Sequence, residues 1–197
     1  MVMPTGEMLN RPALLRLLRW LVPIVLALII SRAGAVTLTG SFSPIAQGSN
    51  VDLTAVGTLD WVHWGLFNQT SVNRKATVAP QIGNFTALFN SSSSFASAYH
   101  YADNYNGYSW SDGTQTIAVT NTTTGMYVLG GAHGETNGFQ IMVPADTALK
   151  TLQVFVGTFA AKGRFQASLS DSTTSYVDTS LDNLGNGPGG VYTINFA

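Results

Sequence analysis

Alternation of apolar and polar residues with a period of two is the feature that most constrains this fold. It recurs after residue 35 in short runs, in which every second residue is apolar. Successive side chains of a strand point to opposite faces of a sheet, so each run predicts a strand with one buried face. The clearest runs have as apolar members Val51, Leu53 and Ala55; Ile117 and Val119; Phe139, Ile141 and Val143; Leu152, Val154 and Val156; and Phe165, Ala167 and Leu169.

Clusters of Gly, Asn, Asp and Ser separate these runs and predict the turns. They fall at residues 47–50, 111–113, 130–131 and 186–190, and such residues suit the backbone angles of tight turns. No window after residue 35 shows the apolar period of 3.6 residues that indicates a helix. Many short strands with regular turns are typical of a sandwich or barrel. We therefore expect an all-β fold, an antiparallel β-sandwich of jelly-roll type, preceded by an N-terminal signal-peptide helix.

Residues 1–35 have the composition of a secretory signal peptide. An apolar stretch at 21–30 follows three arginines and is followed by small residues suited to cleavage. The alternative is a membrane anchor, but only twelve uncharged residues separate Arg19 from Arg32, whereas a spanning helix needs roughly 18 to 20 apolar residues. We expect cleavage, which leaves a secreted β-sandwich domain over 36–197 with no membrane contact.

The formal charge of −1 combines two differently charged parts. The first 35 residues carry four arginines and one glutamate, a charge of +3, so residues 36–197 carry −4. Nucleic-acid binding needs a clustered basic face, so no nucleic-acid partner is expected. The chain has no cysteine. Because small extracellular eukaryotic domains often depend on disulfides, a bacterial protein fits better, and we expect it to be extracellular or at the cell surface.

The chain ends inside a strand-like run, residues 191–197. No turn or charged tail follows this run. A sandwich without its last hairpin would expose a strand edge, and exposed edges invite pairing with other chains. We therefore expect the native domain to be longer and this chain to be truncated at its C-terminus.

Residues that could support catalysis or bind a metal are few. His63, His100 and His133 are far apart in sequence and form no zinc-binding pair. Most aspartates fall at turn-like positions, where they bond to the backbone. A hydrolase would need Glu135 or an aspartate beside His63 or His133. We expect no enzymatic activity and no cofactor, with one structural calcium ion held by carboxylate and amide oxygens as an alternative.

Aromatic residues gather in two segments, 60–65 and 99–110, where rings alternate with Asn, Asp and His. A ring face packs against the C–H groups of a sugar while amides and carboxylates bind its hydroxyls, so these segments are typical of a glycan site. The alternative is that Trp61 and Trp64 fill the core. Being three residues apart on a strand, at most one of them would point inward. The candidate ligand-binding residues are Trp61, His63, Trp64, Tyr105, Tyr108 and Trp110.

Five segments of the chain carry a resemblance to a known family: residues 50–65, 107–114, 121–125, 138–146 and 152–157. They resemble stretches of bacterial secreted modules, most of them uncharacterised, that have galactose-binding-like jelly rolls. The similarity runs from about residue 37 to the end, and in those modules two further strands follow the run that starts at Val191. The resemblance implies carbohydrate binding or surface adhesion, and of the two we expect a non-catalytic module that binds carbohydrate. The alternative is a structural or adhesive module without a small ligand, held to an extracellular protein surface.

Overall fold

The computed structural model describes residues 36–90, 97–130, 137–171 and 173–197, so the predicted signal peptide lies outside the described residues. Strands dominate this part of the chain, and the all-β prediction is confirmed. No helix in these ranges is long and apolar enough to cross a membrane. The elements are β1 (Leu38–Pro44), β2 (Asn50–Asp52), α1 (Leu53–Val56), β3 (Val62–Trp64), β4 (Val72–Lys75), β5 (Thr86–Leu88), β6 (Ala98–Tyr101), β7 (Gly107–Trp110), β8 (Gly113–Thr114), β9 (Val119–Thr122), β10 (Gly125–Val128), β11 (Gly138–Gln140), β12 (Lys150–Val156), β13 (Phe159–Lys162), β14 (Phe165–Ser168), β15 (Ser175–Asp178), β16 (Asp182–Asn186) and β17 (Gly190–Phe196).

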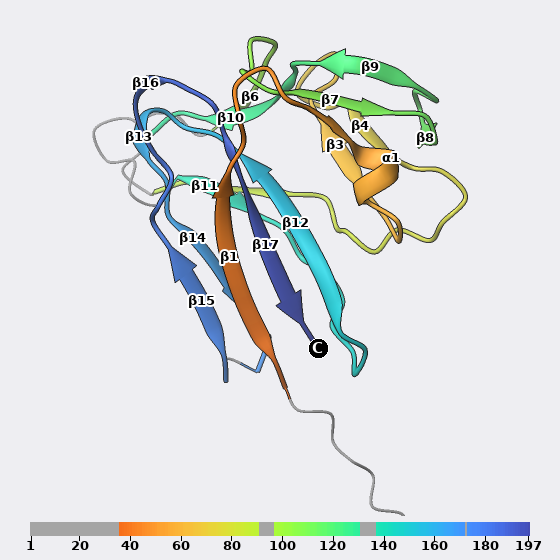
Figure 1. The fold of residues 1–197 in the computed structure, drawn as a ribbon, viewed down its shortest axis with the longest axis vertical. Coiled ribbons are helices and arrows are strands. Elements are labelled where there is room, and N and C mark those ends of the chain that lie inside the picture. The colour runs from red at the N-terminus through yellow and green to blue at the C-terminus, as the bar shows by residue number, and fades with distance from the viewer. Residues whose placement is uncertain (1–35, 91–96, 131–136, 172) are drawn as a thin grey trace, which may run out of the picture. The chain divides into compact units, whose positions relative to one another are not determined.

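The longest strands form one antiparallel sheet in the order β1-β17-β12, which we call the long-strand sheet (Figure 1). Each strand has seven residues, and both pairings run over the full length of β17 without a break in register. Alternate residues of β17 are buried, among them Tyr192, Ile194 and Phe196. Strand β17 is therefore the central strand of its sheet, paired on both sides.

A long hairpin follows β12 and packs beside this sheet (Figure 1). Its outer part pairs β13 with β16, and its inner part pairs β14 with β15. The Phe165 ring stacks on Tyr192 with centroids 4.1 Å apart, and the Tyr192 hydroxyl donates to Asp178 Oδ1 at 3.0 Å. The inner part of the hairpin thus contributes to the core around β17.

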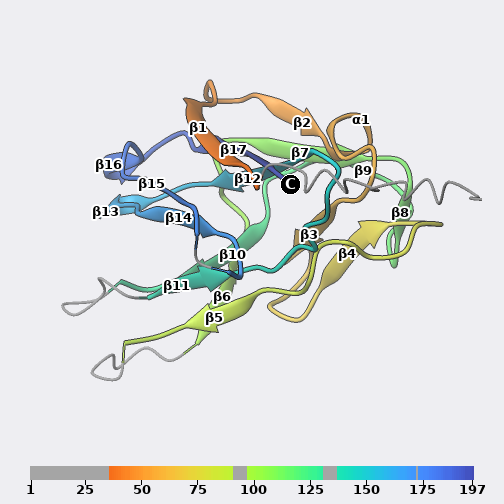
Figure 2. The same ribbon diagram turned by 90° about the horizontal axis from the view of Figure 1, so that it is seen from below.

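A second region is built from two small sheets, β2-β7-β9 and β3-β4-β8, with α1 packed against β7. Strand β2 pairs with β7 in parallel, and the other pairings are antiparallel. The remaining strands form two-stranded ribbons, β10-β6 and β11-β5. Figure 2 shows β5 and β11 on the opposite side of the fold from β1 and β2.

The alternating runs predict the strands with different success. The runs starting at Leu152 and Phe165 are confirmed as β12 and β14. The run at 139–143 is a strand only as far as Gln140, and the run at 117–119 enters β9 only at Val119. Ile117 lies before β9, and its side chain is 74% exposed. The buried strand face that alternation predicted at Ile117 is therefore wrong.

The strand predicted across Val51 to Ala55 is wrong in its second half. Strand β2 ends at Asp52, whose carboxylate accepts hydrogen bonds from the backbone N–H of Thr54 at 2.9 Å and Ala55 at 3.3 Å. These bonds make Asp52 the N-cap of α1. Leu53 is buried from this helical turn, so the same apolar residue that suggested a strand is placed in the core by a helix.

Candidate functional site

Three of the six predicted ligand-binding residues lie in the interior. Trp61 and Trp110 are 3% and 2% exposed, and together with Leu53 and Leu66 they form what we call the tryptophan cluster. The centroids of the two indole rings are 5.2 Å apart, and the His63 ring lies 5.2 Å from Trp110. Buried rings of this kind present no face to a ligand in solvent, so Trp61 and Trp110 serve the core. The core alternative considered from the sequence named Trp61 and Trp64, and of these two only Trp61 is buried.

His63 is buried with them and contacts a backbone carbonyl. Its Nε2 lies 3.1 Å from the carbonyl oxygen of Thr124, and its Nδ1 is enclosed without a hydrogen-bond partner. Burial disfavours the charged imidazolium and lowers the pKa of His63 to about 4, although the bond to Thr124 acts in the opposite direction. His63 is therefore neutral at pH 7 and is placed as a packing residue.

Asp112 joins the tryptophan cluster to its surroundings. Its Oδ1 accepts hydrogen bonds from Trp61 Nε1 at 2.9 Å and from the Thr54 hydroxyl at 2.6 Å. Its Oδ2 lies 2.5 Å from Lys75 Nζ. Partial burial opposes ionisation, but these bonds outweigh it and lower the pKa of Asp112. One carboxylate thus ties together α1, the segment before β3, and β4.

The other three predicted residues are half-buried. Tyr108 packs between His63 and Phe155, at centroid distances of 5.8 and 5.7 Å, and burial raises the pKa of its phenol. The ring of Trp64 packs edge-on against Phe85 at 5.6 Å. The backbone carbonyl of Tyr105 accepts a hydrogen bond from Gly48 at 2.8 Å. Tyr108 thus packs with Trp61, His63 and Trp110, whereas the ring of Trp64 packs on Phe85, so the fold does not gather the six residues into one site.

The structure brings together a different set of rings, on the ribbon β10-β6. Tyr127 is paired with Tyr99 and Gly125 with Tyr101, so the three tyrosines lie on one face of the ribbon, which we call the tyrosine face. Ring centroids are 5.5 Å apart for Tyr99 and Tyr127 and 6.0 Å apart for Tyr101 and Tyr127. Tyr127 is 37% exposed and Tyr99 is half-buried.

Gly125 lets the tyrosine face pack closely. A Cβ at this position would lie 2.8 Å from the Tyr101 ring, so only glycine leaves room for that ring against the neighbouring strand. Burial, and to a smaller extent the charge of Asp103, raises the pKa of Tyr101. Tyr101 is therefore a neutral phenol, and its ring packs against that of Tyr127.

Sequence reasoning included Tyr99 and Tyr101 in an aromatic segment but missed Tyr127. The segment around Tyr127 contains a single ring, and no local pattern distinguishes it. Only the register between β6 and β10, whose strands are 24 or more residues apart in the chain, places Tyr127 opposite Tyr99. The signal that could have identified Tyr127 is therefore a pairing, which composition does not contain.

Within the described ranges, no group of three or more His, Cys, Asp or Glu side chains could hold a metal ion. His133 and Glu135, named above for a hydrolase, lie outside the described residues. Comparison with models of protein families, with curated proteins and with solved structures found no match.

Proposed function

We propose that this chain is a secreted, non-catalytic binding module with a jelly-roll-type β-sandwich that holds a glycan on the tyrosine face. The observation that carries the proposal is the register of β10 and β6, which sets Tyr99 and Tyr127 side by side with one ring 37% exposed. Aromatic faces pack on the apolar faces of sugar rings, and a phenol also offers a polar hydroxyl. Two neighbouring rings can contact two neighbouring sugar units.

Polar side chains beside the rings suit the hydroxyl groups of a sugar. Asp103 and Asn104 follow β6 directly, with Asp103 exposed and Asn104 half-buried. The backbone N–H of Asn104 donates to the Thr123 carbonyl at 3.0 Å, which fixes this segment against the loop before β10. Trp64, Tyr105 and Tyr108 keep partly accessible side chains and remain candidates for further contacts.

The test is a binding assay of the full chain on insoluble polysaccharides and on a glycan array. We expect Tyr127→Ala to weaken binding about fivefold to tenfold, since loss of one stacked ring removes about 1 kcal/mol. Ile117→Ala is the matched control, because Ile117 is more exposed than Tyr127 and lies outside the tyrosine face. The proposal would be contradicted if the chain bound none of the polysaccharides or arrayed glycans. It would also be contradicted if a folded variant combining Tyr99→Ala with Tyr127→Ala bound as well as the unchanged chain.

A second candidate, an adhesive module without a small ligand, is favoured by the outer part of the long hairpin. Phe159 on β13 is 72% exposed and Leu184 on β16 is fully exposed. Strands β13 and β16 pair only with each other among the described residues, so each has a free edge. Sedimentation of the full chain and of a Phe159→Asp/Leu184→Asp variant tests it, and a concentration-independent monomer that captures no partner would exclude it.

A further inference from the structure

An open groove of about 450 Å³ lies between two loops on the side of β4. The segments 80–84 and 142–144 form its walls, and Arg74 of β4 also lines it. We call it the arginine groove. Its volume is within the range of roughly 300 to 1,000 Å³ that small ligands occupy, and most of its lining side chains are apolar.

Backbone hydrogen bonds fix both walls. The N–H of Gly83 donates to the Met142 carbonyl at 2.9 Å and joins the two loops. A Cβ on Gly83 would lie 3.1 Å from that carbonyl oxygen, which is tighter than a side chain ordinarily allows. Asp60 Oδ2 accepts hydrogen bonds from the N–H groups of Gln81 at 2.7 Å and Ile82 at 2.9 Å. The groove is therefore part of the folded framework.

Arg74 enters this framework without a carboxylate partner. Its Nη1 donates to the Ile82 carbonyl at 2.6 Å and its Nη2 to Asn84 Oδ1 at 2.5 Å. Among the described residues, no Asp or Glu forms an ion pair with it, whereas Lys75, Lys150 and Lys162 each pair with an aspartate. A guanidinium has five N–H donors, so three remain on a half-buried cation that is held in place by neutral oxygens.

We propose that the arginine groove binds the carboxylate of a uronic acid unit in an acidic glycan. A carboxylate can accept parallel hydrogen bonds from a guanidinium, and such charge-assisted pairs are the stronger ones. The apolar side chains of Met142 and Val143 would cover the C–H groups of the sugar ring. The glycan class rests on the proposed function, while the charge of the ligand follows from Arg74 alone.

A peptide carboxylate fits this groove less well than a uronate. Capture of a peptide C-terminus commonly uses a nest of free backbone N–H groups. Here the N–H groups of Gln81, Ile82 and Gly83 are all taken by Asp60 and Met142. The guanidinium of Arg74 and the side-chain amides of Gln81 and Asn84 line the groove, and such donors match a carboxylate together with hydroxyls.

The test is calorimetric titration of the full chain with three probes: a galacturonic acid trimer, its neutral methyl ester and a triglutamate peptide. We expect the acid trimer to bind about tenfold or more tightly than the ester, because only the acid can pair with the guanidinium. Added NaCl should weaken the acid trimer selectively. Arg74→Gln should remove the preference for the acid, and Ile117→Ala is the control.

Arg74→Gln also loosens the 80–84 loop, so a second variant is needed. Met142 is 74% exposed, and Met142→Ala should leave the melting temperature unchanged while weakening the acid trimer several-fold. Equal binding of acid and ester, or binding of triglutamate only, would overturn this inference and leave the proposed function standing. Failure of every glycan to bind, on the array as well as here, would overturn both.

Discussion

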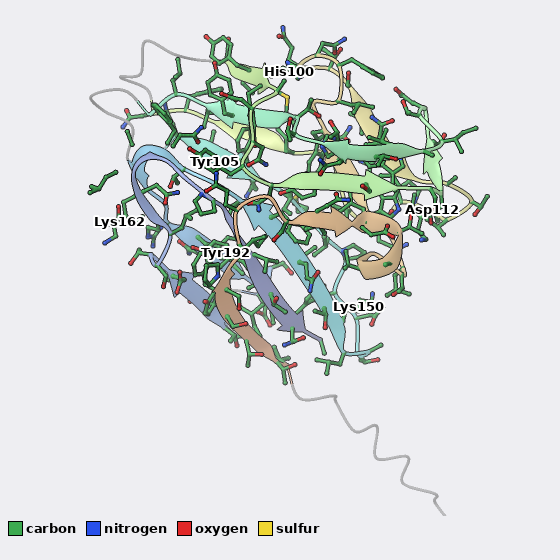
Figure 3. All side chains as sticks on the ribbon, turned by 45° about the horizontal axis from the view of Figure 1, so that its top comes forward. His100, Tyr105, Asp112, Lys150, Lys162 and Tyr192 are labelled. Atoms are coloured by element: carbon green, nitrogen blue, oxygen red, sulfur yellow. The ribbon has the colours of Figure 1, made fainter. Side chains whose placement is uncertain are left out.

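The long-strand sheet and the tryptophan cluster are stabilised in different ways. In the sheet, seven-residue strands pair without a break, and alternation along β17 buries every second side chain. Around the tryptophan cluster the strands have two to four residues, and one carboxylate, Asp112, bonds to side chains from three segments. Figure 3 shows Asp112 well apart from Tyr192, which lies on β17, the central strand of the sheet.

This difference predicts where single residues matter. Many similar backbone hydrogen bonds stabilise the long-strand sheet, so each polar side chain on its surface contributes little to the free energy of unfolding. In the other region a few side chains carry both the apolar and the polar contacts. The predictions below test that contrast, in order of decreasing effect on the free energy of unfolding.

Trp110→Ala should have the largest effect. Its ring is 2% exposed and packs on Trp61 and His63, and removing a buried ring of this size costs about 3–5 kcal/mol. Urea unfolding monitored by circular dichroism measures the change. Ile117→Ala, at an exposed site, should change it by less than about 0.5 kcal/mol. A Trp110→Ala loss no larger than that of Ile117→Ala would show that the tryptophan cluster is not a core.

The buried His63 should make stability depend on pH. The pKa of His63 is about 4 in the folded chain against 6.5 when unfolded, so the folded state takes up the proton less readily. The stability is complete above pH 6.5 and falls as the pH drops from 6.5 towards 4, by up to roughly 3 kcal/mol. Comparing the pH profiles of the chain and of His63→Gln measures this contribution, and parallel profiles would contradict it.

Asp112→Asn should lower the free energy of unfolding by about 2 kcal/mol. The substitution removes the negative charge that accepts hydrogen bonds from Lys75, Thr54 and Trp61 beside the tryptophan cluster. The pKa of Asp112 is lowered in the folded state, so this stabilisation is present above the unfolded pKa and is lost as the pH falls through the folded one. Asp146→Asn is the matched control. Asp146 also pairs with a lysine, at 2.7 Å, but its side chain is exposed, so a much smaller loss of stability than for Asp112→Asn is expected. Equal effects of the two variants would remove the contrast between the regions.

Thr151→Val should have the smallest effect. The Thr151 hydroxyl donates to Asn195 Oδ1 at 2.7 Å across the pair β12-β17, on an exposed face of the long-strand sheet. Such a cross-strand pair contributes about 0.2–1 kcal/mol, and valine keeps the strand propensity of threonine. Thermal unfolding measures the shift. A loss as large as that of Asp112→Asn would mean that polar side chains support both regions alike.

Prediction from the sequence succeeded where residues next to each other in the chain decide the structure. Strands β12 and β14 follow directly from alternation, and Gly48, with φ of +77°, lies in the predicted turn at 47–50. Prediction failed where a local hydrogen bond competed with the pattern. Asp52 caps α1 and ends β2 because its carboxylate accepts hydrogen bonds from Thr54 and Ala55, and the alternation of apolar residues does not reveal such bonds.

The residues of the candidate site show the same difference between what neighbouring residues predict and what distant contacts decide. Composition identified segments rich in rings, but burial assigned Trp61, His63 and Trp110 to the interior. The tyrosine face depends on the pairing of Tyr99 with Tyr127, and the arginine groove on Gly83 meeting Met142 across 59 positions of the chain. No local sequence pattern predicts either contact, because each joins residues that are far apart in the chain.

The sequence by itself determined the strand-rich composition, the turns and the low charge, because these follow from the preferences of residues and their immediate neighbours. Only the tertiary structure decided that the last strand lies between β1 and β12, which rings are buried, and that Arg74 has no carboxylate partner among the described residues. The physical reason is that burial and charge pairing are properties of surfaces brought together from distant parts of the chain. The period of two along a strand predicts which side chains share a face. The elements that pack against the strand determine whether that face is buried and what it contacts.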